Sequence, residues 1–398
     1  MSDLEKSSDG RFQAIVRAGI EHQWDRFSYY RNLCARKNLS RADLAAIAAD
    51  GAYDRLPGVV STAFKRSKDL MEDLSDLAVP GTFQVSSSTS GDPSYVYTNL
   101  EDRAYVAGLY ARTFASPASS AGVAFAPSLR ILRNLSKKAA VMGRSAVLRM
   151  QLGLEGGYAR IPDLAVTIDV DLPKTILNRA LGRPAAIRKM PASTLATIIR
   201  NAASRGQTIS LGGLTLLLRP YLEEFREGEF SLHEKAHIAF SGGGYSGAKG
   251  TIRGAKIDKP AFIARIASVF GIDSAFWSTN IKDIYSFTET NAQIEGYWNQ
   301  GLNDFLFRPS PECRMYIVDP ENERPLRSGR GLIKIVSPSI SGRPASANMC
   351  VLQFDTAEIV SLSPEGWVET FTRVSRFEGA ASRGSEGCAF KAAEIAGE

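Results

Sequence analysis

Strand-like and helix-like stretches alternate along the chain from Gln84 onward, and this alternation constrains the fold more than any other feature. Short apolar runs at residues 122–126, 164–168 and 237–241 are typical of strands, whereas residues 194–203 have the spacing of an amphipathic helix. This pattern favours an α/β core with substantially parallel strands, in which ligands bind at the carboxyl ends of the strands.

The segments on either side of this core have other patterns. Residues 11–50 are predicted to form helices, with Ser40 as the N-cap of one of them. Short strand-like runs at 315–318, 331–336 and 347–352 are separated by Gly, Pro and Ser. We therefore predict four parts: a helical segment at 1–80 packed on the core, an α/β nucleotide-binding core at 81–310, a small β-rich subdomain at 311–378, and a mobile tail at 379–398.

A loop rich in hydroxyl groups follows the start of the core. Ser86, Ser87, Ser88, Thr89 and Ser90 are consecutive and precede Gly91. Such hydroxyls and the neighbouring backbone N–H groups are donors that suit a polyphosphate, and glycine lets the backbone approach it closely. The segment lacks the Gly-Lys-Ser/Thr ending of a P-loop. Taken alone, it also fits a flexible serine-rich linker.

Three further motifs follow in a fixed order: the glycines Gly242, Gly243 and Gly244, then Tyr285-Ser286-Phe287-Thr288-Glu289, then Asp355. This order resembles the adenylate-forming ligase superfamily, and most closely its acyl-protein synthetases (LuxE-like, long-chain-fatty-acid–luciferin-component ligases) of the bacterial luminescence fatty-acid reductase complex. It is also similar to phenylacetate-CoA ligase-like enzymes. The likeness covers roughly residues 54–390 and includes Phe64-Lys65 and Cys388. It implies the N-terminal-domain fold of these ligases, with their mobile C-terminal domain largely absent.

The resemblance also implies an activity: activation of a carboxylic acid, in the closest likeness a fatty acid, with ATP and Mg²⁺ to give an acyl-adenylate. It assigns the leaving phosphates to Ser86–Gly91, the α-phosphate to Thr288, Mg²⁺ to Glu289, the adenine to Tyr285 and Gly242–Gly244, and the ribose hydroxyls to Asp355, with Arg376 in the same nucleotide site.

The acyl acceptor implied by the resemblance is a thiol. It is Cys388 on the tail or a partner protein, such as an acyl-accepting reductase or a carrier protein. Transfer to CoA, as in an acid-CoA ligase, is the alternative. Ser88, Asp92 and Ser286 depart from the family pattern, so a non-catalytic nucleotide-binding protein is the alternative of another class.

The net charge and the cysteines of the chain indicate which partners and which location to expect. The net charge of +6 does not predict nucleic-acid binding, because Arg130, Arg133, Lys137, Lys138, Arg144 and Arg149 fall within an apolar helical pattern typical of a solvated helix face. The other interpretations of this basic stretch are that it docks an acidic partner or acyl carrier, or that it attracts the nucleotide. With no long apolar run and four widely spaced cysteines, we expect a cytoplasmic protein without integral membrane association.

His233-Glu234-Lys235-Ala236-His237 matches the H-E-x-x-H zinc motif. We do not interpret it as a zinc site, because no histidine follows His237 and the next glutamate is Glu289. The apolar residues after His237 also predict a strand, on which the two imidazoles would not share a helix face.

Overall fold

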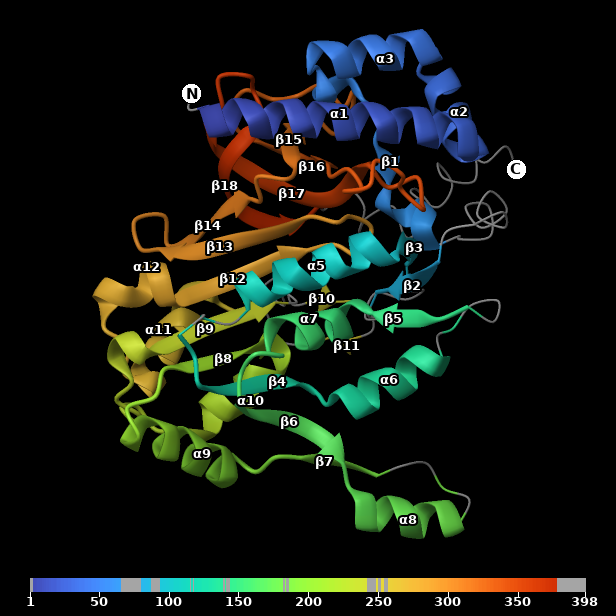
Figure 1. Ribbon diagram of the computed structural model, residues 1–398. Helices are drawn as coiled ribbons and strands as arrows, with labels where there is room; N and C mark the ends of the chain where they lie inside the picture. The colour runs from blue at the N-terminus through green and yellow to red at the C-terminus, as the bar shows by residue number, and fades with distance from the viewer. Residues whose placement is uncertain are drawn as a thin grey trace.

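A large mixed β-sheet forms the centre of the protein (Figure 1). The computed structural model describes residues 3–65, 80–86, 94–114, 116, 118–138, 140, 144–181, 183, 186–241, 248–249, 252–253 and 257–377. In sheet order the strands are β15 (Arg314–Val318), β16 (Arg330–Val336), β17 (Cys350–Leu362), β18 (Val368–Arg376), β14 (Asp304–Pro309), β13 (Gln293–Asn299), β12 (Ile281–Ser286), β9 (Ala236–Ser241), β8 (Ile209–Leu214), β4 (Ala121–Pro127), β6 (Asp163–Val170) and β7 (Ile187–Lys189), with β1 (Val59–Val60) beside β17.

Strands β12, β9, β8, β4 and β6 are mutually parallel, which confirms the predicted α/β core and its three apolar strands. Helices cover both faces of this half, as the residues of β4 show. Val123 and Phe125 pack with α9, α10 and α11, whereas Ala124 and Ala126 pack with α5, α6 and α7. These helices are α5 (Leu100–Thr113), α6 (Leu129–Lys138), α7 (Arg149–Gly157), α9 (Ala192–Ser204), α10 (Thr215–Glu224) and α11 (Lys259–Phe270).

The other half of the sheet is antiparallel from β12 to β15. The predicted strands at 315–318 and 331–336 are confirmed as β15 and β16, and they continue the same sheet as the core. The prediction for 347–352 is wrong at its start, because β17 begins at Cys350. The preceding segment contacts another strand instead, since Ser346 Oγ accepts from Tyr97 N and donates to Tyr97 O. The boundaries between the four predicted parts remain predictions.

The N-terminal helices lie over β15–β17 (Figure 1). Ser40 caps α3 as predicted, in a capping box with Asp43. Val16, Tyr30 and Leu44 from the helices share one apolar cluster with Val336 and Val351 of the sheet. The helices of this layer are α1 (Asp3–Arg26), α2 (Ser28–Arg36) and α3 (Arg41–Asp50), followed by the short turns η1 (Tyr53–Arg55) and η2 (Ser61–Lys65).

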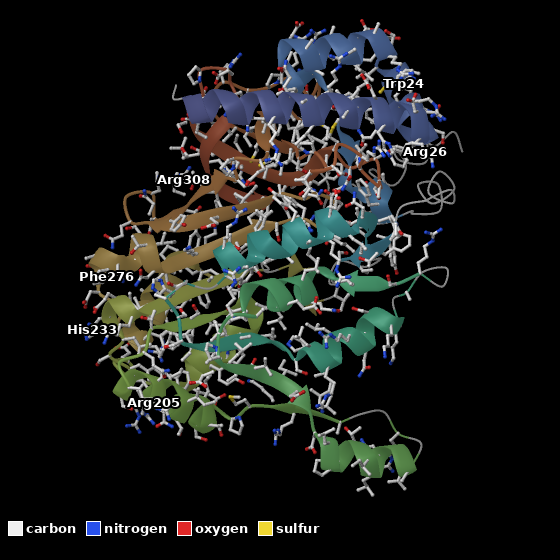
Figure 2. The ribbon with its side chains drawn as sticks, viewed as in Figure 1. Trp24, Arg26, Arg205, His233, Phe276 and Arg308 are labelled. Atoms are coloured by element: carbon white, nitrogen blue, oxygen red, sulfur yellow. The ribbon has the colours of Figure 1, made fainter. Side chains whose placement is uncertain are left out.

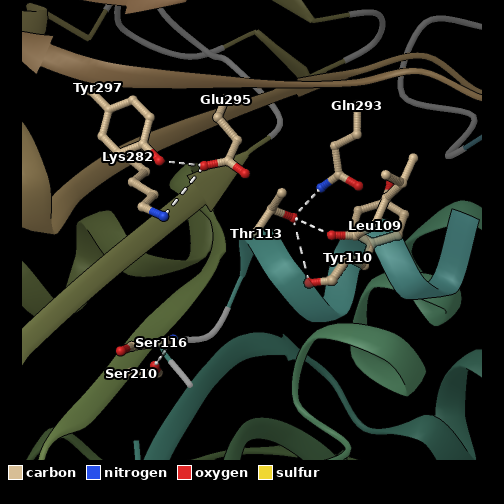
Figure 3. A network of polar contacts seen from close by, with 9 residues as sticks. All are labelled: Leu109, Tyr110, Thr113, Ser116, Ser210, Lys282, Gln293, Glu295 and Tyr297. Atoms are coloured by element: carbon tan, nitrogen blue, oxygen red, sulfur yellow. Dashed lines mark hydrogen bonds and ion pairs between the residues drawn. The ribbon is translucent and has the colours of Figure 1, made fainter. Parts of the chain in front are cut away.

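A second, three-stranded sheet consists of β3 (Tyr95–Asn99), β2 (Gly81–Val85) and β5 (Ala146–Leu148). Helix α5 follows β3 directly and is anchored to the large sheet. There the amide of Gln293 on β13 donates to Thr113 Oγ1 at 2.6 Å (Figure 3). The remaining elements are α8 (Leu172–Ala180), η3 (His233–Lys235), β10 (Ala248–Lys249), β11 (Ile252–Arg253), η4 (Ser274–Phe276) and α12 (Trp277–Asn280).

Candidate nucleotide site

The hydroxyl-rich loop begins and ends at two serines that bond to each other. Strands β2 and β3 are antiparallel, and beyond their last pair Ser86 N donates to Ser94 O at 3.0 Å. Ser94 N donates to Ser86 Oγ at 2.8 Å. Of the predicted phosphate-binding residues, Ser86 therefore lies at the base of the loop, whereas Ser87, Ser88, Thr89, Ser90 and Gly91 lie outside the described residues.

Glu289 lies at this loop base, although 195 positions separate it from Ser94 in the chain. It follows β12, is only 9% exposed, and is preceded by the buried Thr288. Burial raises the pKa of the Glu289 carboxyl, and the hydrogen bond with Ser94 and the positive charges of Arg149 and Lys65 oppose that shift. The structure thus brings the base of the loop and the Thr-Glu motif together, as the family resemblance implied.

Arg149, which begins α7, is the residue of this site that the sequence analysis missed. It was expected on a solvated helix face, but it is 7% exposed, because the three-residue strand β5 interrupts the helical pattern and turns this position inward. Its Nη1 donates to Gln84 Oε1 and its Nε to the Tyr110 hydroxyl at 3.1 Å. Among the described residues, nothing accepts from its Nη2. Unmet donor capacity on a buried cation suits an anionic ligand.

Four other basic residues of that stretch lie on a solvated helix face as predicted, whereas Arg144 precedes β5 and is half-buried over the ring of Tyr97. Arg130, Arg133, Lys137 and Lys138 are exposed on α6.

Polar contacts extend from Arg149 to Ser286, the residue of the Tyr-x-x-Thr-Glu motif that differs from the family pattern. The Tyr110 hydroxyl lies 3.2 Å from the hydroxyl of Ser286, which stands where the family pattern has glycine. On the other side, the Gln84 amide donates to Thr98 Oγ1 at 3.0 Å. A chain of polar groups therefore connects the hairpin β2–β3, the start of α7, α5 and the end of β12.

Tyr285, Asp355 and Arg376 form a second cluster. The Tyr285 hydroxyl donates to Asp355 Oδ2 at 2.8 Å, and Arg376 Nε lies 3.3 Å from Asp355 Oδ1. Burial and the Asp355 charge raise the pKa of Tyr285 well above its ordinary value, so Tyr285 is a neutral donor near pH 7. Since β12 and β17 are not sheet neighbours, this bond indicates that the sheet curls there. Three residues predicted for the nucleotide site thus lie together.

The predicted glycine run is entered directly from β9. Ser241, the last described residue before Gly242, pairs with Ile284 of the parallel strand β12, next to Tyr285. The glycines Gly242, Gly243 and Gly244 themselves lie outside the described residues.

The thiols within the described range are poor nucleophiles. Cys34, Cys313 and Cys350 are free and buried, and a buried thiol packs as a small apolar side chain. Burial raises the pKa of Cys34 to about 12, and that of Cys313 and of Cys350 to about 11. Cys388 lies outside the described residues.

The H-E-x-x-H segment forms a short turn and a strand, as expected. His233 belongs to η3 at the molecular surface (Figure 2), where its Nδ1 lies 3.2 Å from Asp273 Oδ2. His237 belongs to β9, and burial lowers its pKa. The two imidazoles therefore do not share one helix face.

The site fits Mg²⁺ held in part by a ligand rather than by a protein cage. Within the described ranges, no three His, Cys, Asp or Glu side chains are grouped for a metal. Glu289 supplies one buried carboxylate, and Mg²⁺ commonly takes one or two carboxylates with phosphate oxygens and water.

The chain matches no protein-family model and no curated protein sequence. Among solved structures it is similar to an open conformation of 2-hydroxyisobutyryl-CoA ligase in complex with 2-HIB-AMP and CoA, with a TM-score of 0.55 and 16% identity over 92% of this chain and 68% of the other. The thioesterification state of that ligase gives a TM-score of 0.53, again at 16% identity, over 95% and 69%. The protein therefore has the fold of an adenylate-forming ligase, and it spans about two thirds of those chains.

In the described part of the chain, no single helix is long and apolar enough to cross a membrane. Helix α11 and the segment Ser274–Asn280 are together long and apolar enough, but the chain bends by 120° between them. Six apolar residues of α11 are buried in the largest core cluster, which is typical of a core helix.

Proposed function

We propose that the protein uses ATP to convert a carboxylic acid into an acyl-adenylate and then transfers the acyl group to a thiol. The observation that carries this proposal is the meeting of Glu289, Ser94 and Arg149 at the base of the hydroxyl-rich loop. A buried carboxylate and a buried guanidinium with a free N–H suit a ligand that carries both a metal ion and negative phosphates.

In this proposal the two clusters have separate tasks. Ser86–Gly91, Thr288 and Arg149 hold phosphates, and Glu289 holds Mg²⁺, which supplies charge neutralisation for the phosphate oxygens when bound. Asp355 accepts hydrogen bonds from the ribose hydroxyls, since each of its oxygens retains a lone pair beside Tyr285 and Arg376. Tyr285 and Gly242–Gly244 line the adenine.

The reaction requires positioning more than proton transfer. A carboxylate oxygen of the acid attacks the α-phosphorus of ATP, the bond from that phosphorus to the bridging oxygen breaks, and pyrophosphate leaves. Arg149 supplies fixed positive charge for the phosphate groups without solvent rearrangement, because the protein already holds it through Gln84 and Tyr110.

The test is ATP–pyrophosphate exchange that depends on an added acid, screened over short, aromatic and long-chain carboxylic acids. We expect exchange with at least one class of acid, and its loss in Glu289→Gln. Glu365→Gln, at an exposed glutamate, is the matched control. ATP binding without exchange for any acid would favour the non-catalytic alternative.

The acyl acceptor is a separate part of the proposal, with Cys388 or the thiol of a partner reductase or carrier protein as candidates. Within the chain we favour Cys388, because the other three thiols are buried and have raised pKa values. CoA is the second candidate, since the similar ligase structures contain CoA.

Intact-protein mass after incubation with ATP and a substrate acid separates these acceptors. We expect a hydroxylamine-labile acyl adduct in the wild type and its absence in Cys388→Ser, with pyrophosphate exchange unchanged in both. If the wild type forms no adduct and consumes CoA, CoA is the acceptor. If the adduct persists in Cys388→Ser, the nucleophile is another residue.

A further inference from the structure

Helix α8 and strand β7 form a hairpin at the last edge of the large sheet, away from the nucleotide site. Strand β7 pairs with β6 alone, and α8 extends beyond the sheet at the end opposite α1–α3 (Figure 1). The hairpin is held by its polar side: Thr175 Oγ1 donates to Ala186 O at 3.3 Å and accepts from Ala186 N at 2.9 Å. Thr175 itself is buried, at 5% exposed.

The apolar side of α8 faces solvent, the reverse of an ordinary surface helix. Leu172, Ile176, Leu177 and Leu181 are 50%, 70%, 60% and 56% exposed, and Ile187 of β7 is 64% exposed. At about 100° per residue, the four leucine and isoleucine positions from 172 to 181 cover an arc of about 180°. Five of the ten large apolar side chains exposed in the described ranges belong to this hairpin, so they form a cluster rather than isolated surface residues.

The charges around this apolar arc are mainly positive. Lys174, Arg183 and Arg188 are exposed on the hairpin. The nearby acids are used within the protein, since Asp169 Oδ1 accepts from Ser128 Oγ at 2.6 Å and Asp171 Oδ1 accepts from Lys174 N at 3.1 Å. The binding partner must therefore offer apolar area and negative charge together.

This charge argues against a second copy of the chain, because pairing two such hairpins would bring the same cations together. The apolar residues lie on a projecting helix rather than in a groove. The partner must therefore cover a convex surface. A bilayer meets both conditions, because side chains on a projecting arc enter the interface while flanking Lys and Arg stay at the headgroups. We propose that the α8–β7 hairpin docks the protein peripherally on an anionic lipid surface. This inference is independent of the proposed reaction.

The experiment is co-sedimentation of the full chain with phosphatidylcholine vesicles that contain or lack about a third of phosphatidylserine. We expect binding to the anionic vesicles, weakened about tenfold or more by added salt. Ile176→Ser/Leu177→Ser should weaken it at least tenfold, because each buried aliphatic side chain contributes on the order of tenfold in affinity. Lys174→Gln/Arg188→Gln should reduce binding to anionic vesicles and leave binding to neutral ones unchanged.

The matched control is Leu302→Ser/Val360→Ser, which removes two exposed apolar side chains from other parts of the surface and should bind like the wild type. Unchanged thermal unfolding of all variants shows that the effect is not misfolding. Absent vesicle binding, or equal binding by the hairpin variants, would overturn the proposal. If the protein does not bind vesicles but forms a dimer or binds an acidic protein, and if that interaction requires Ile176 and Leu177, the face belongs to that partner instead.

Discussion

Removal of the Arg149 guanidinium should destabilise the protein, mainly through the buried hydrogen bonds that are lost with it. Arg149→Met loses two charge-assisted hydrogen bonds, to Gln84 and Tyr110, and removes one of the two positive charges that act on the buried Glu289. Each hydrogen bond to a charged group typically contributes about 1.5–3 kcal/mol. We expect a loss of that size in the free energy of unfolding, with Arg149→Lys intermediate because it keeps the charge without the fork.

A double-mutant cycle measures the coupling between the charges of Arg149 and Glu289. Once Glu289→Gln has removed the carboxylate, Arg149→Met should cost less than it does in the wild type. We expect the double variant to be more stable than the sum of the single effects by about 1–3 kcal/mol. The measurement is equilibrium denaturation of the four proteins, with pyrophosphate exchange recorded on the same samples.

Arg144→Met is the control for Arg149→Met. Arg144 is half-buried over the ring of Tyr97, 5.5 Å from its centroid, so its loss should cost only about 0.5–1 kcal/mol. Effects of Arg149→Met and Glu289→Gln that add to within about 0.5 kcal/mol would refute the reasoning, because independent residues behave in that way.

Three further predictions follow from the site. Glu289→Gln should lower turnover in pyrophosphate exchange more than ATP affinity, and equal turnover would contradict the role given to the carboxylate. The pKa of Glu289 is raised in the folded state, so the carboxyl lowers the free energy of unfolding at neutral pH, and this loss disappears as pH falls through the raised pKa. The wild type should therefore gain stability relative to Glu289→Gln as the pH is lowered, measured by denaturation at several pH values. Tyr285→Phe should weaken ATP binding about tenfold, by titration, since Asp355 loses the donor that orients it, and unchanged affinity would remove Asp355 from the ribose site.

The sequence predicted those parts of the site whose motifs stand in the same order as in the family that the chain resembles. A run of hydroxyls, a Thr-Glu pair and an isolated Asp355 are readable in order, and the structure brings Ser86, Glu289, Tyr285, Asp355 and Arg376 into two polar clusters. Their order along the chain needs no knowledge of packing.

Arg149 could not be found in the same way. Its neighbours in sequence suggest one amphipathic helix, and the interruption by β5 depends on pairing with β2, more than sixty residues earlier. The start of β17 was misplaced for a related reason, since Ser346 bonds to Tyr97 on a strand far away in sequence. Both errors come from long-range contacts, which override local propensity.

The layer of α1–α3 over β15–β17 has a consequence for the newly made chain. Val59 pairs with Val351, so the first helices cannot bury their apolar side chains until almost three hundred further residues have been synthesised. At roughly 5–20 residues per second, this delay lasts on the order of 15–60 s. During that time Phe12, Tyr30 and Leu44 are available to the wrong partners, so a chaperone that acts early on the ribosome should raise the yield of folded protein more than one added after release.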